Sequence, residues 1–185
     1  VHIYLRTAGG GDTHWAYEME GGFWPIRLQN DHSPLAVCQH AGRLVLAGGD
    51  GYLRRIGGDD DDGSDIASHV LVGPFRLGRP GKFGRLNELQ AVLAAGSGDV
   101  NWRVVAGDTA EEATDNAKAA IEAHQAGTSF SQYVRQSGQW TSGRSVRSRP
   151  RVRAPWVCLW LQSTKKWAYE SIAAGLAASG EWRGR

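Results

Sequence analysis

Residues 154–163 read APWVCLWLQS. From Trp156 to Leu161 the odd and the even positions are both apolar, so neither side of an extended strand would face water. A short uncharged run of this kind is typical of a strand that is covered on both faces. The sequence therefore predicts that this stretch is the buried central strand of a β-domain.

Strand-like segments precede and follow this central stretch. In residues 101–107 the side chains of Trp102, Val104 and Ala106 face one way, and Arg103 and Val105 face the other. Further segments with a strand-like composition are DIASHVLVGPFRLG (65–78), FSQYVRQ (130–136), RSVRSRPRVR (144–153) and KKWAYESIAAGLAAS (165–179). Residues 65–185 are therefore predicted to form a β-sandwich or jelly-roll domain.

One helix is predicted within this domain, at about residues 109–126. Thr109 and Glu112 have the spacing of a capping box, in which both side chains bind free N–H groups at a helix start. Gly127 is a suitable residue to end the helix. An apolar stripe of small residues predicts that the helix lies flat on a sheet: Ala113, Ala117, Ala120 and Ile121.

The first 57 residues have short apolar segments separated by turn residues. Trp15, Tyr17 and Met19 alternate with polar residues, as in a half-buried strand. Asp50-Gly51 lies between two apolar runs and is a strong hairpin signal. Residues 1–57 are therefore predicted to form an antiparallel meander like the blade of a β-propeller.

Four adjacent carboxylates, Asp59 to Asp62, come after this meander. Because like charges repel and resist burial, residues 58–64 are predicted to be a solvated acidic linker. A calcium site that includes Asp65 is the less favoured interpretation, since the segment lacks the spacing of the known calcium loop. No metal ion is predicted.

The formal net charge of +2 hides an uneven distribution. Residues 58–127 carry a net charge of −6, whereas residues 128–185 carry +8. Four arginines spaced two apart would share one face of a strand: Arg147, Arg149, Arg151 and Arg153. They are candidates for contact with DNA phosphates or with an acidic neighbouring subunit, and a charged, solvated strand edge is the third interpretation. No aromatic residue alternates with them, so reading of bases is not predicted.

Several classes of protein lack support. The six histidines form no metal-binding pair, and no nucleophile elbow, phosphate-binding loop or dinucleotide fingerprint occurs, so neither an enzyme nor a cofactor is predicted. No apolar run approaches the ~18 residues of a membrane span. Cys38 and Cys158 lie in apolar runs and are predicted to be buried free thiols. The eight tryptophans could stack on sugars, but most lie in apolar strand segments, which favours core packing.

Three motifs resemble the final propeller blade of tailed-bacteriophage virion proteins: Trp15-x-Tyr17, Gly22-Phe23-Trp24-Pro25 and Leu46-x-Gly48-Gly49-Asp50-Gly51-Tyr52. The segments 61–78, 96–113 and 138–153 are similar to the region C-terminal to the blade in such proteins. The resemblance is to the C-terminal part of structural proteins of the tail or neck, of the nozzle or tail-hub type. It implies a location in the virion, contacts with copies of itself and with other virion proteins, and no catalytic residues.

A single blade does not close a propeller, which needs at least about four. The chain begins at Val1 and its one methionine is Met19, so further blades are expected before it in a longer polypeptide. The predicted function is that of a structural component of a phage tail or neck, which forms a homo-oligomeric ring that supports assembly and the DNA conduit. The alternative is a carbohydrate- or receptor-binding module at the tail periphery.

Overall fold

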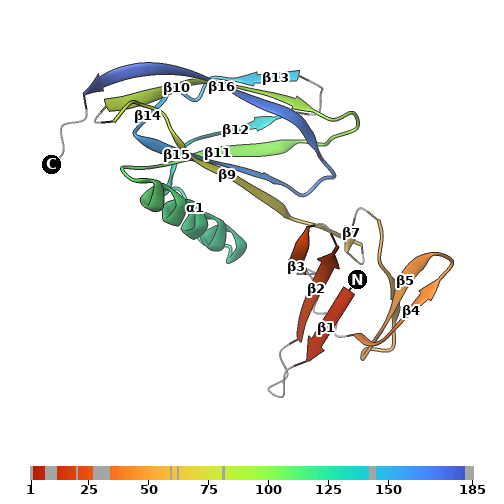
Figure 1. Cartoon of the computed structure of the whole chain (residues 1–185). Coiled ribbons are helices and arrows are strands. Elements are labelled where there is room, and N and C mark those ends of the chain that lie inside the picture. Colours follow the sequence, from red (N-terminus) through yellow and green to blue (C-terminus); the bar gives the residue numbers. More distant parts are fainter. Residues whose placement is uncertain are drawn as a thin grey trace. The chain divides into compact units, whose positions relative to one another are not determined.

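A computed structural model describes residues 2–6, 12–19, 21–26, 34–58, 60–61, 63–80, 82–141 and 145–181. The chain divides into two compact units, Val1–Ile66 (unit 1) and Ala67–Arg185 (unit 2). The described residues are mainly β, with several antiparallel sheets and a single helix (Figure 1). The predicted fold class, mainly β with one inserted helix, is confirmed.

Unit 2 contains two antiparallel sheets. The first has the order β12-β11-β15-β9, with bounds Val134–Trp140, Val100–Gly107, Trp156–Ser163 and Ser68–Arg76. The second is built on β10 (Lys82–Leu93), which pairs with β13 (Ser145–Ser148), β14 (Val152–Ala154) and β16 (Tyr169–Glu181). The β10 residues that pair with β13 and β14 also pair with β16, so β16 lies on the opposite edge of β10.

The main core of unit 2 is formed by apolar residues from both sheets. Trp102, Val104 and Ala106 of β11 belong to it, whereas Val105 belongs to a second cluster on the helix side of the same sheet. This alternation confirms the period-two pattern of the sequence. It also leaves β15 buried on both faces, since Leu159 and Leu161 join the main core and Cys158 joins the helix-side cluster.

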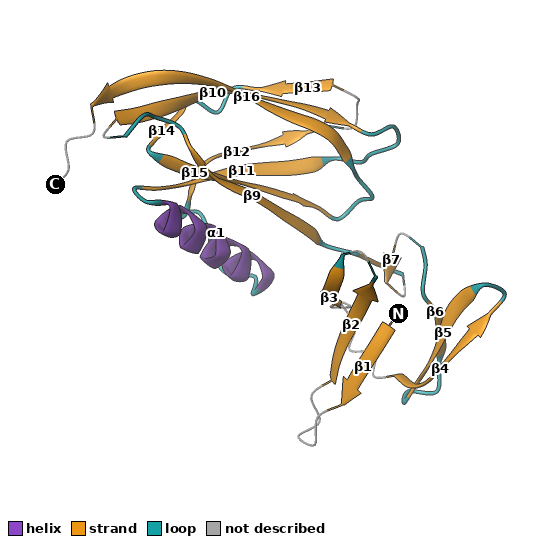
Figure 2. Ribbon diagram, viewed as in Figure 1, coloured by secondary structure: helices purple, strands orange, loops and turns teal. Residues whose placement is uncertain are grey.

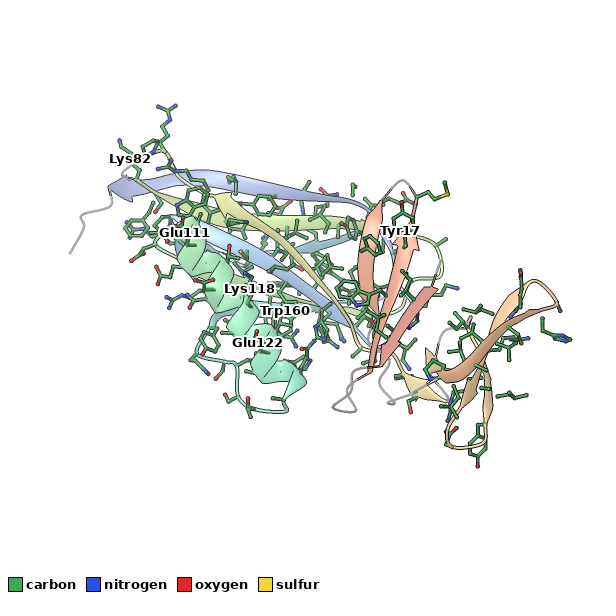
Figure 3. The ribbon with its side chains drawn as sticks, turned by 60° about the horizontal axis from the view of Figure 1, so that its bottom comes forward. Tyr17, Lys82, Glu111, Lys118, Glu122 and Trp160 are labelled. Atoms are coloured by element: carbon green, nitrogen blue, oxygen red, sulfur yellow. The ribbon has the colours of Figure 1, made fainter. Side chains whose placement is uncertain are left out.

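Helix α1 (Ala110–Gln125) covers the outer face of the first sheet (Figure 2). Its buried residues are Ala113, Ala117 and Ala120, three of the four members of the predicted stripe, and the fourth, Ile121, is half-buried. Gly107 allows the close approach, because a Cβ atom there would overlap the backbone nitrogen of Ala113. Charged residues of the helix are exposed, including Glu111, Lys118 and Glu122 (Figure 3).

The predicted capping box is present at the start of α1. Thr109 Oγ1 accepts a hydrogen bond from the backbone N–H of Glu112 at 3.1 Å. Glu112 Oε2 accepts one from the backbone N–H of Asp108 at 2.8 Å, one residue before the usual partner. The first bond pairs an N–H group that the first helical turn leaves without a helical partner, and the second fixes the residue before the N-cap.

Unit 1 contains two separate three-stranded antiparallel meanders. One has the order β1-β2-β3 (His2–Arg6, Asp12–Glu18 and Gly22–Ile26), and the other β4-β5-β6 (Pro34–His40, Arg43–Gly48 and Leu53–Arg55). The strands expected in one meander are thus divided between two sheets. Within the expected linker, β7 (Asp60–Asp61) pairs with β8 (Ser64–Asp65) in a very short hairpin.

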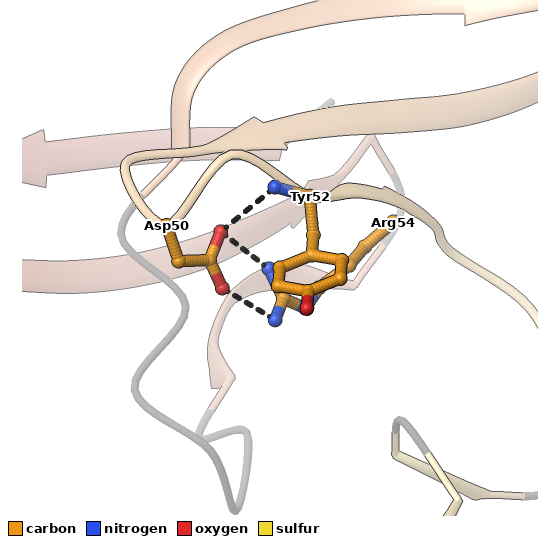
Figure 4. A network of polar contacts seen from close by, with 3 residues as sticks. All are labelled: Asp50, Tyr52 and Arg54. Atoms are coloured by element: carbon orange, nitrogen blue, oxygen red, sulfur yellow. Dashed lines mark hydrogen bonds and ion pairs between the residues drawn. The ribbon is translucent and has the colours of Figure 1, made fainter.

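The turn between β5 and β6 confirms the Asp50-Gly51 hairpin signal. Gly51 has a φ of +86°, a backbone conformation that favours glycine. Asp50 accepts hydrogen bonds from Arg54 Nη1 at 3.0 Å and from the backbone N–H of Tyr52 at 3.2 Å (Figure 4). The Arg54 side chain, followed by the Tyr52 backbone bond, lowers the pKa of Asp50 to about 2.

Candidate interaction surfaces

The four predicted arginines do not share one continuous strand. Arg147 lies on β13 and Arg153 on β14, and the chain between these strands leaves the sheet. Pro150 is buried in this connection and Arg151 has a φ of +53°. The single strand expected over residues 144–153 is therefore wrong, because proline has no N–H to donate and Arg151 turns the backbone away from an extended path.

The two arginines on strands nevertheless lie on the same face of the second sheet. Arg147 is opposite Gln90 and Arg153 is opposite Arg85, and all four side chains are exposed. Both positions on β10 alternate with buried residues, so this is the face away from the core. Arg149 and Arg151 are exposed as well.

Two of the arginines have partners within unit 2. Arg147 Nε donates to Glu88 Oε1 at 2.7 Å, and the Arg153 guanidinium lies 4.7 Å from the ring centre of Phe83. An exposed ion pair of this kind contributes only about 0–1 kcal/mol, so it does not prevent exchange for a phosphate or a carboxylate of another molecule. Contact with DNA or with a neighbouring subunit stays a prediction.

Unit 1 leaves the apolar faces of its sheets uncovered. Leu46, which is 3% exposed, is its single buried apolar residue among those described. The largest exposed fractions belong to Met19 at 88% and Leu53 at 76%. Other large apolar side chains that are exposed in this unit are Leu5, Phe23, Leu35, Val37, Tyr52 and Ile66. Among the described residues, the sheets of unit 1 therefore lack a second layer that would bury them.

One face of the β1-β2-β3 sheet has an apolar hollow of about 370 Å³. It is lined by Ile3, Leu5, Trp15 and Phe23. The strand register explains the grouping, since Ile3 is opposite Trp15. Tyr17 lies on the same face, with its ring 4.8 Å from that of Phe23. Trp15 and Tyr17 are half-buried, as predicted, but Met19, expected on the same face, follows the end of β2 and is 88% exposed, so the prediction is wrong for Met19.

The two cysteines differ in their exposure to solvent. Cys158 is fully buried, as predicted, and burial raises the pKa of its thiol. Cys38 is exposed, so the prediction of a second buried thiol is wrong. The reason is that no second layer from the described residues covers β4, whose residues after Pro34 are all exposed.

Most of the tryptophans of unit 2 pack in or against its core. Trp102, Trp140 and Trp160 are buried, and Trp156 and Trp167 pack against the core clusters while partly exposed. Trp24 and Trp182 lie outside the part whose side chains are described. Core packing is thus confirmed for Trp102 and Trp160, whereas Trp15 lines the hollow of unit 1.

A group of cationic and aromatic side chains lies between α1 and the first sheet. The Arg103 guanidinium is 4.3 Å from the ring centre of Trp160 and 5.0 Å from that of Phe130. His69 Nδ1 accepts a hydrogen bond from Trp160 Nε1 at 3.2 Å, and the rings of His69 and His124 are 5.6 Å apart. No sequence pattern indicates this group, because its members are brought together only by the sheet register and the helix.

Burial lowers the pKa of both histidines in this group. For His69 the nearby His124 and Arg103 lower it further, and for His124 Arg103 does so. Arg103 Nη1 is buried without a hydrogen-bond partner in the described part of the chain, and its guanidinium lies against aromatic rings. The arrangement therefore disfavours protonation of both histidines, so acid is expected to weaken it.

One edge of the second sheet, formed by β16, has a long stretch without charged residues or prolines. β16 pairs with β10 along its length, and no described strand pairs with its other edge. Residues 173–178 are all exposed, and residues 171–179 contain no charged residue and no proline. The sequence pattern predicts the strand but not this edge, although the uncharged run is a visible signal.

Neither a metal centre nor a membrane span is found among the described residues. No group of three or more His, Cys, Asp or Glu side chains there could hold a metal ion. Within the same residues, no helix is long and apolar enough to cross a membrane. Comparison of the sequence with models of known protein families gives no match, and neither does comparison with curated proteins.

Proposed function

We propose that the chain is a structural component of a phage virion tail or neck, where copies of it form a ring that supports assembly and the DNA conduit. The observation that carries the proposal is the set of uncovered apolar faces in unit 1. A polypeptide that leaves Leu53, Phe23 and Leu35 in water has surfaces suited to burial against other protein.

The energetics favour coverage of these faces. Burial of apolar surface contributes about 25 cal/mol per Å², so a few large side chains stabilise a contact by several kcal/mol. Unit 1 spans only residues 1–66, a size at which a single core is marginal even when it is complete. Neighbours in an assembly would supply the missing layer, as adjacent blades and subunits do in the proteins that the sequence resembles.

The charge distribution supports head-to-tail contacts between copies. The exposed Asp60 and Asp65 belong to the acidic middle of the chain, and the exposed Arg149 and Arg151 belong to its basic end. Complementary charges steer association and fix its register. A heterologous contact of this kind repeats around a ring until it closes.

The arginines are also suited to contact with DNA in a conduit. Non-specific contact with phosphates needs exposed cationic side chains and no base-reading groups. If all four bind phosphates, the logarithm of the affinity falls with the logarithm of salt concentration with a slope of roughly −3.6. Fluorescence anisotropy with duplex DNA over a salt series measures this slope, and a slope near zero would rule out the contact.

The second candidate, a carbohydrate- or receptor-binding module, is favoured by the hollow beside Trp15 and Phe23. Sugar sites combine an aromatic platform with polar groups that fix the hydroxyls. The lining of this hollow is entirely apolar, so an apolar protein segment fits it better than a sugar does.

The oligomeric state of the purified chain tests the proposal. Analytical ultracentrifugation and negative-stain imaging over a wide range of concentrations should show ring-shaped oligomers. Phe23→Asp should weaken the assembly by about 30-fold or more, since loss of a central aromatic contact typically costs at least about 2 kcal/mol. Tyr133→Asp, a partly exposed aromatic residue in unit 2, is the matched control. A chain that is monomeric at every concentration would contradict the proposal.

A further inference from the structure

Between the register shifts at Glu170 and Gly180, the outer edge of β16 lacks the features that usually protect a sheet edge. Natural edge strands carry charged residues, prolines or bulges that prevent pairing with other chains. The opposite edge of the same sheet has them, in Arg147, Pro150 and Arg153, together with the break between β13 and β14. β16 is thirteen residues long and has neither a charge nor a proline from Ser171 to Ser179.

The inward face of β16 extends beyond the core. Leu176 is opposite Leu86, which is 3% exposed, yet Leu176 itself is 51% exposed. Ile172, on the same face, packs partly against the core, whereas Ala174 and Ala178 are exposed. The strand therefore has apolar side chains and a backbone edge that no described strand pairs with at the same place.

The sequence of the strand is nearly symmetric about Gly175. Residues 171–179 read SIAAGLAAS, so reversal of the direction places like next to like. In an antiparallel pairing centred on Gly175, Ser171 meets Ser179 and Ala173 meets Ala177 on the outward face. On the inward face Ile172 meets Ala178 and Leu176 meets Ala174. Each larger residue meets a small one, and no two charges of the same sign oppose each other.

We propose that β16 pairs with β16 of a second copy of this chain, antiparallel and about a two-fold axis at Gly175. Backbone hydrogen bonds between the two edges would join the second sheets of two copies into one continuous sheet. The contact uses the same residues of both copies and closes after two. It goes beyond the proposed ring, because a ring needs head-to-tail contacts that this two-fold contact cannot supply.

Site-specific cross-linking tests the register. In the full chain with Cys38→Ser, which removes the exposed native thiol, Ala173→Cys and Ala177→Cys are prepared separately; buried Cys158 stays as an internal control. A short bis-thiosulfonate reagent should link Ala173→Cys to Ala177→Cys when the two proteins are mixed, and should link neither protein efficiently to itself. Self-linking of Ala173→Cys would indicate a parallel pairing or another antiparallel register and overturn the proposal, as would the absence of linked product in the mixture.

Charge exchange tests the contact without a reagent. The double variant Ala173→Asp/Ala177→Asp places two pairs of like charges opposite each other and should abolish the dimer. Mixing it with Ala173→Lys/Ala177→Lys should restore a heterodimer. Ala95→Asp/Ala126→Asp, which adds the same charge at exposed positions outside residues 171–179, should leave the dimer intact.

The outcomes separate this inference from the proposed function. If the Asp double variant loses the two-fold dimer and still forms rings, both the β16 proposal and the ring proposal are supported. If it forms the same dimers as the unsubstituted chain, β16 is not the contact, and the ring proposal is unaffected. If the unsubstituted chain forms rings but never dimers, the β16 proposal alone is overturned.

Discussion

Units 1 and 2 are both built from short strands and turns. Apolar side chains are nevertheless buried in unit 2 and largely exposed in unit 1. Every buried apolar residue of the described chain except Leu46 lies in unit 2. Unit 2 has two facing sheets and a helix, so its strands pack against a second layer. β15 is covered on both faces. Unit 1 has two three-stranded sheets with their apolar faces exposed. An alternating pattern thus specifies a strand, but only a second layer turns its apolar face into a core.

The largest expected difference between the units concerns their central aromatic residues. Trp160→Ala removes a fully buried side chain and should destabilise unit 2 by about 3–5 kcal/mol. Phe23→Ala in unit 1 removes an exposed one and should change stability by less than about 0.5 kcal/mol. Pulse labelling of Cys158 in a Cys38→Ser background reports the opening of unit 2 during urea titration, and hydrogen exchange of β1 to β6 reports that of unit 1. Equal effects of the two substitutions would remove the distinction between the units.

Glycine substitutions test the same difference in packing between the two units. Gly107→Ala places a Cβ atom against the backbone nitrogen of Ala113, so α1 must move away from the sheet, at a cost of about 1–3 kcal/mol. In unit 1, Gly49→Ala meets only ordinary contacts with Leu35, at 3.8 Å or more, and should be nearly neutral. The same Cys158 labelling measures the first, since Cys158 lies beneath α1. A neutral Gly107→Ala would show that the helix is not closely docked.

The helix cap should have a smaller effect. Thr109→Ala removes the acceptor for the Glu112 backbone N–H and should destabilise unit 2 by about 1 kcal/mol. Thr109→Ser keeps the hydroxyl and should retain most of that stability. Helix content by circular dichroism, followed through urea unfolding, distinguishes the two variants, and an identical loss in both would contradict a capping role.

The smallest expected effect is a response to mild acid, above the ordinary pKa of an aspartate, that unit 2 has and the Asp50 turn of unit 1 lacks. The folded-state pKa values of His69 and His124 are lowered from 6.5, so the unfolded chain binds more protons in that range. Stability is therefore fully present above the ordinary pKa and is lost as the pH falls toward the lowered values. Asp50, with a pKa of about 2, keeps its charge throughout this range. His124→Phe should flatten the pH dependence of Cys158 protection, and an unchanged slope would contradict the assignment.

The sequence predicted the features that depend on local patterns. The alternation in β11, the central position of β15, the capping box at Thr109 and the Asp50-Gly51 turn all depend on neighbouring residues, and the structure confirms each. It did not predict the division of unit 1 into two sheets, because which strands pair is decided by contacts between distant segments. The exposure of Cys38 was missed for the same reason, since an apolar run does not reveal whether a second layer covers it.

The arginine row shows a related difficulty. Spacing by two predicts a shared face only if the strand continues, and Pro150 with Arg151 interrupts it. Arg147 and Arg153 nevertheless lie on the same face of the second sheet, because β13 and β14 both pair with β10. The group around Arg103 could not have been predicted, since it joins residues that are as many as 91 positions apart.

Hydrogen exchange measured by mass spectrometry on the full chain, dilute and assembled, tests most directly whether unit 2 is complete in itself and unit 1 needs neighbours. In the dilute chain, amides of β11 and β15 should exchange slowly and those of β1 to β6 quickly, because only the former lie in a closed core. Assembly should slow exchange in β1 to β6 and leave β11 and β15 unchanged. Protection of β1 to β6 in the dilute chain as strong as that of β15 would contradict this.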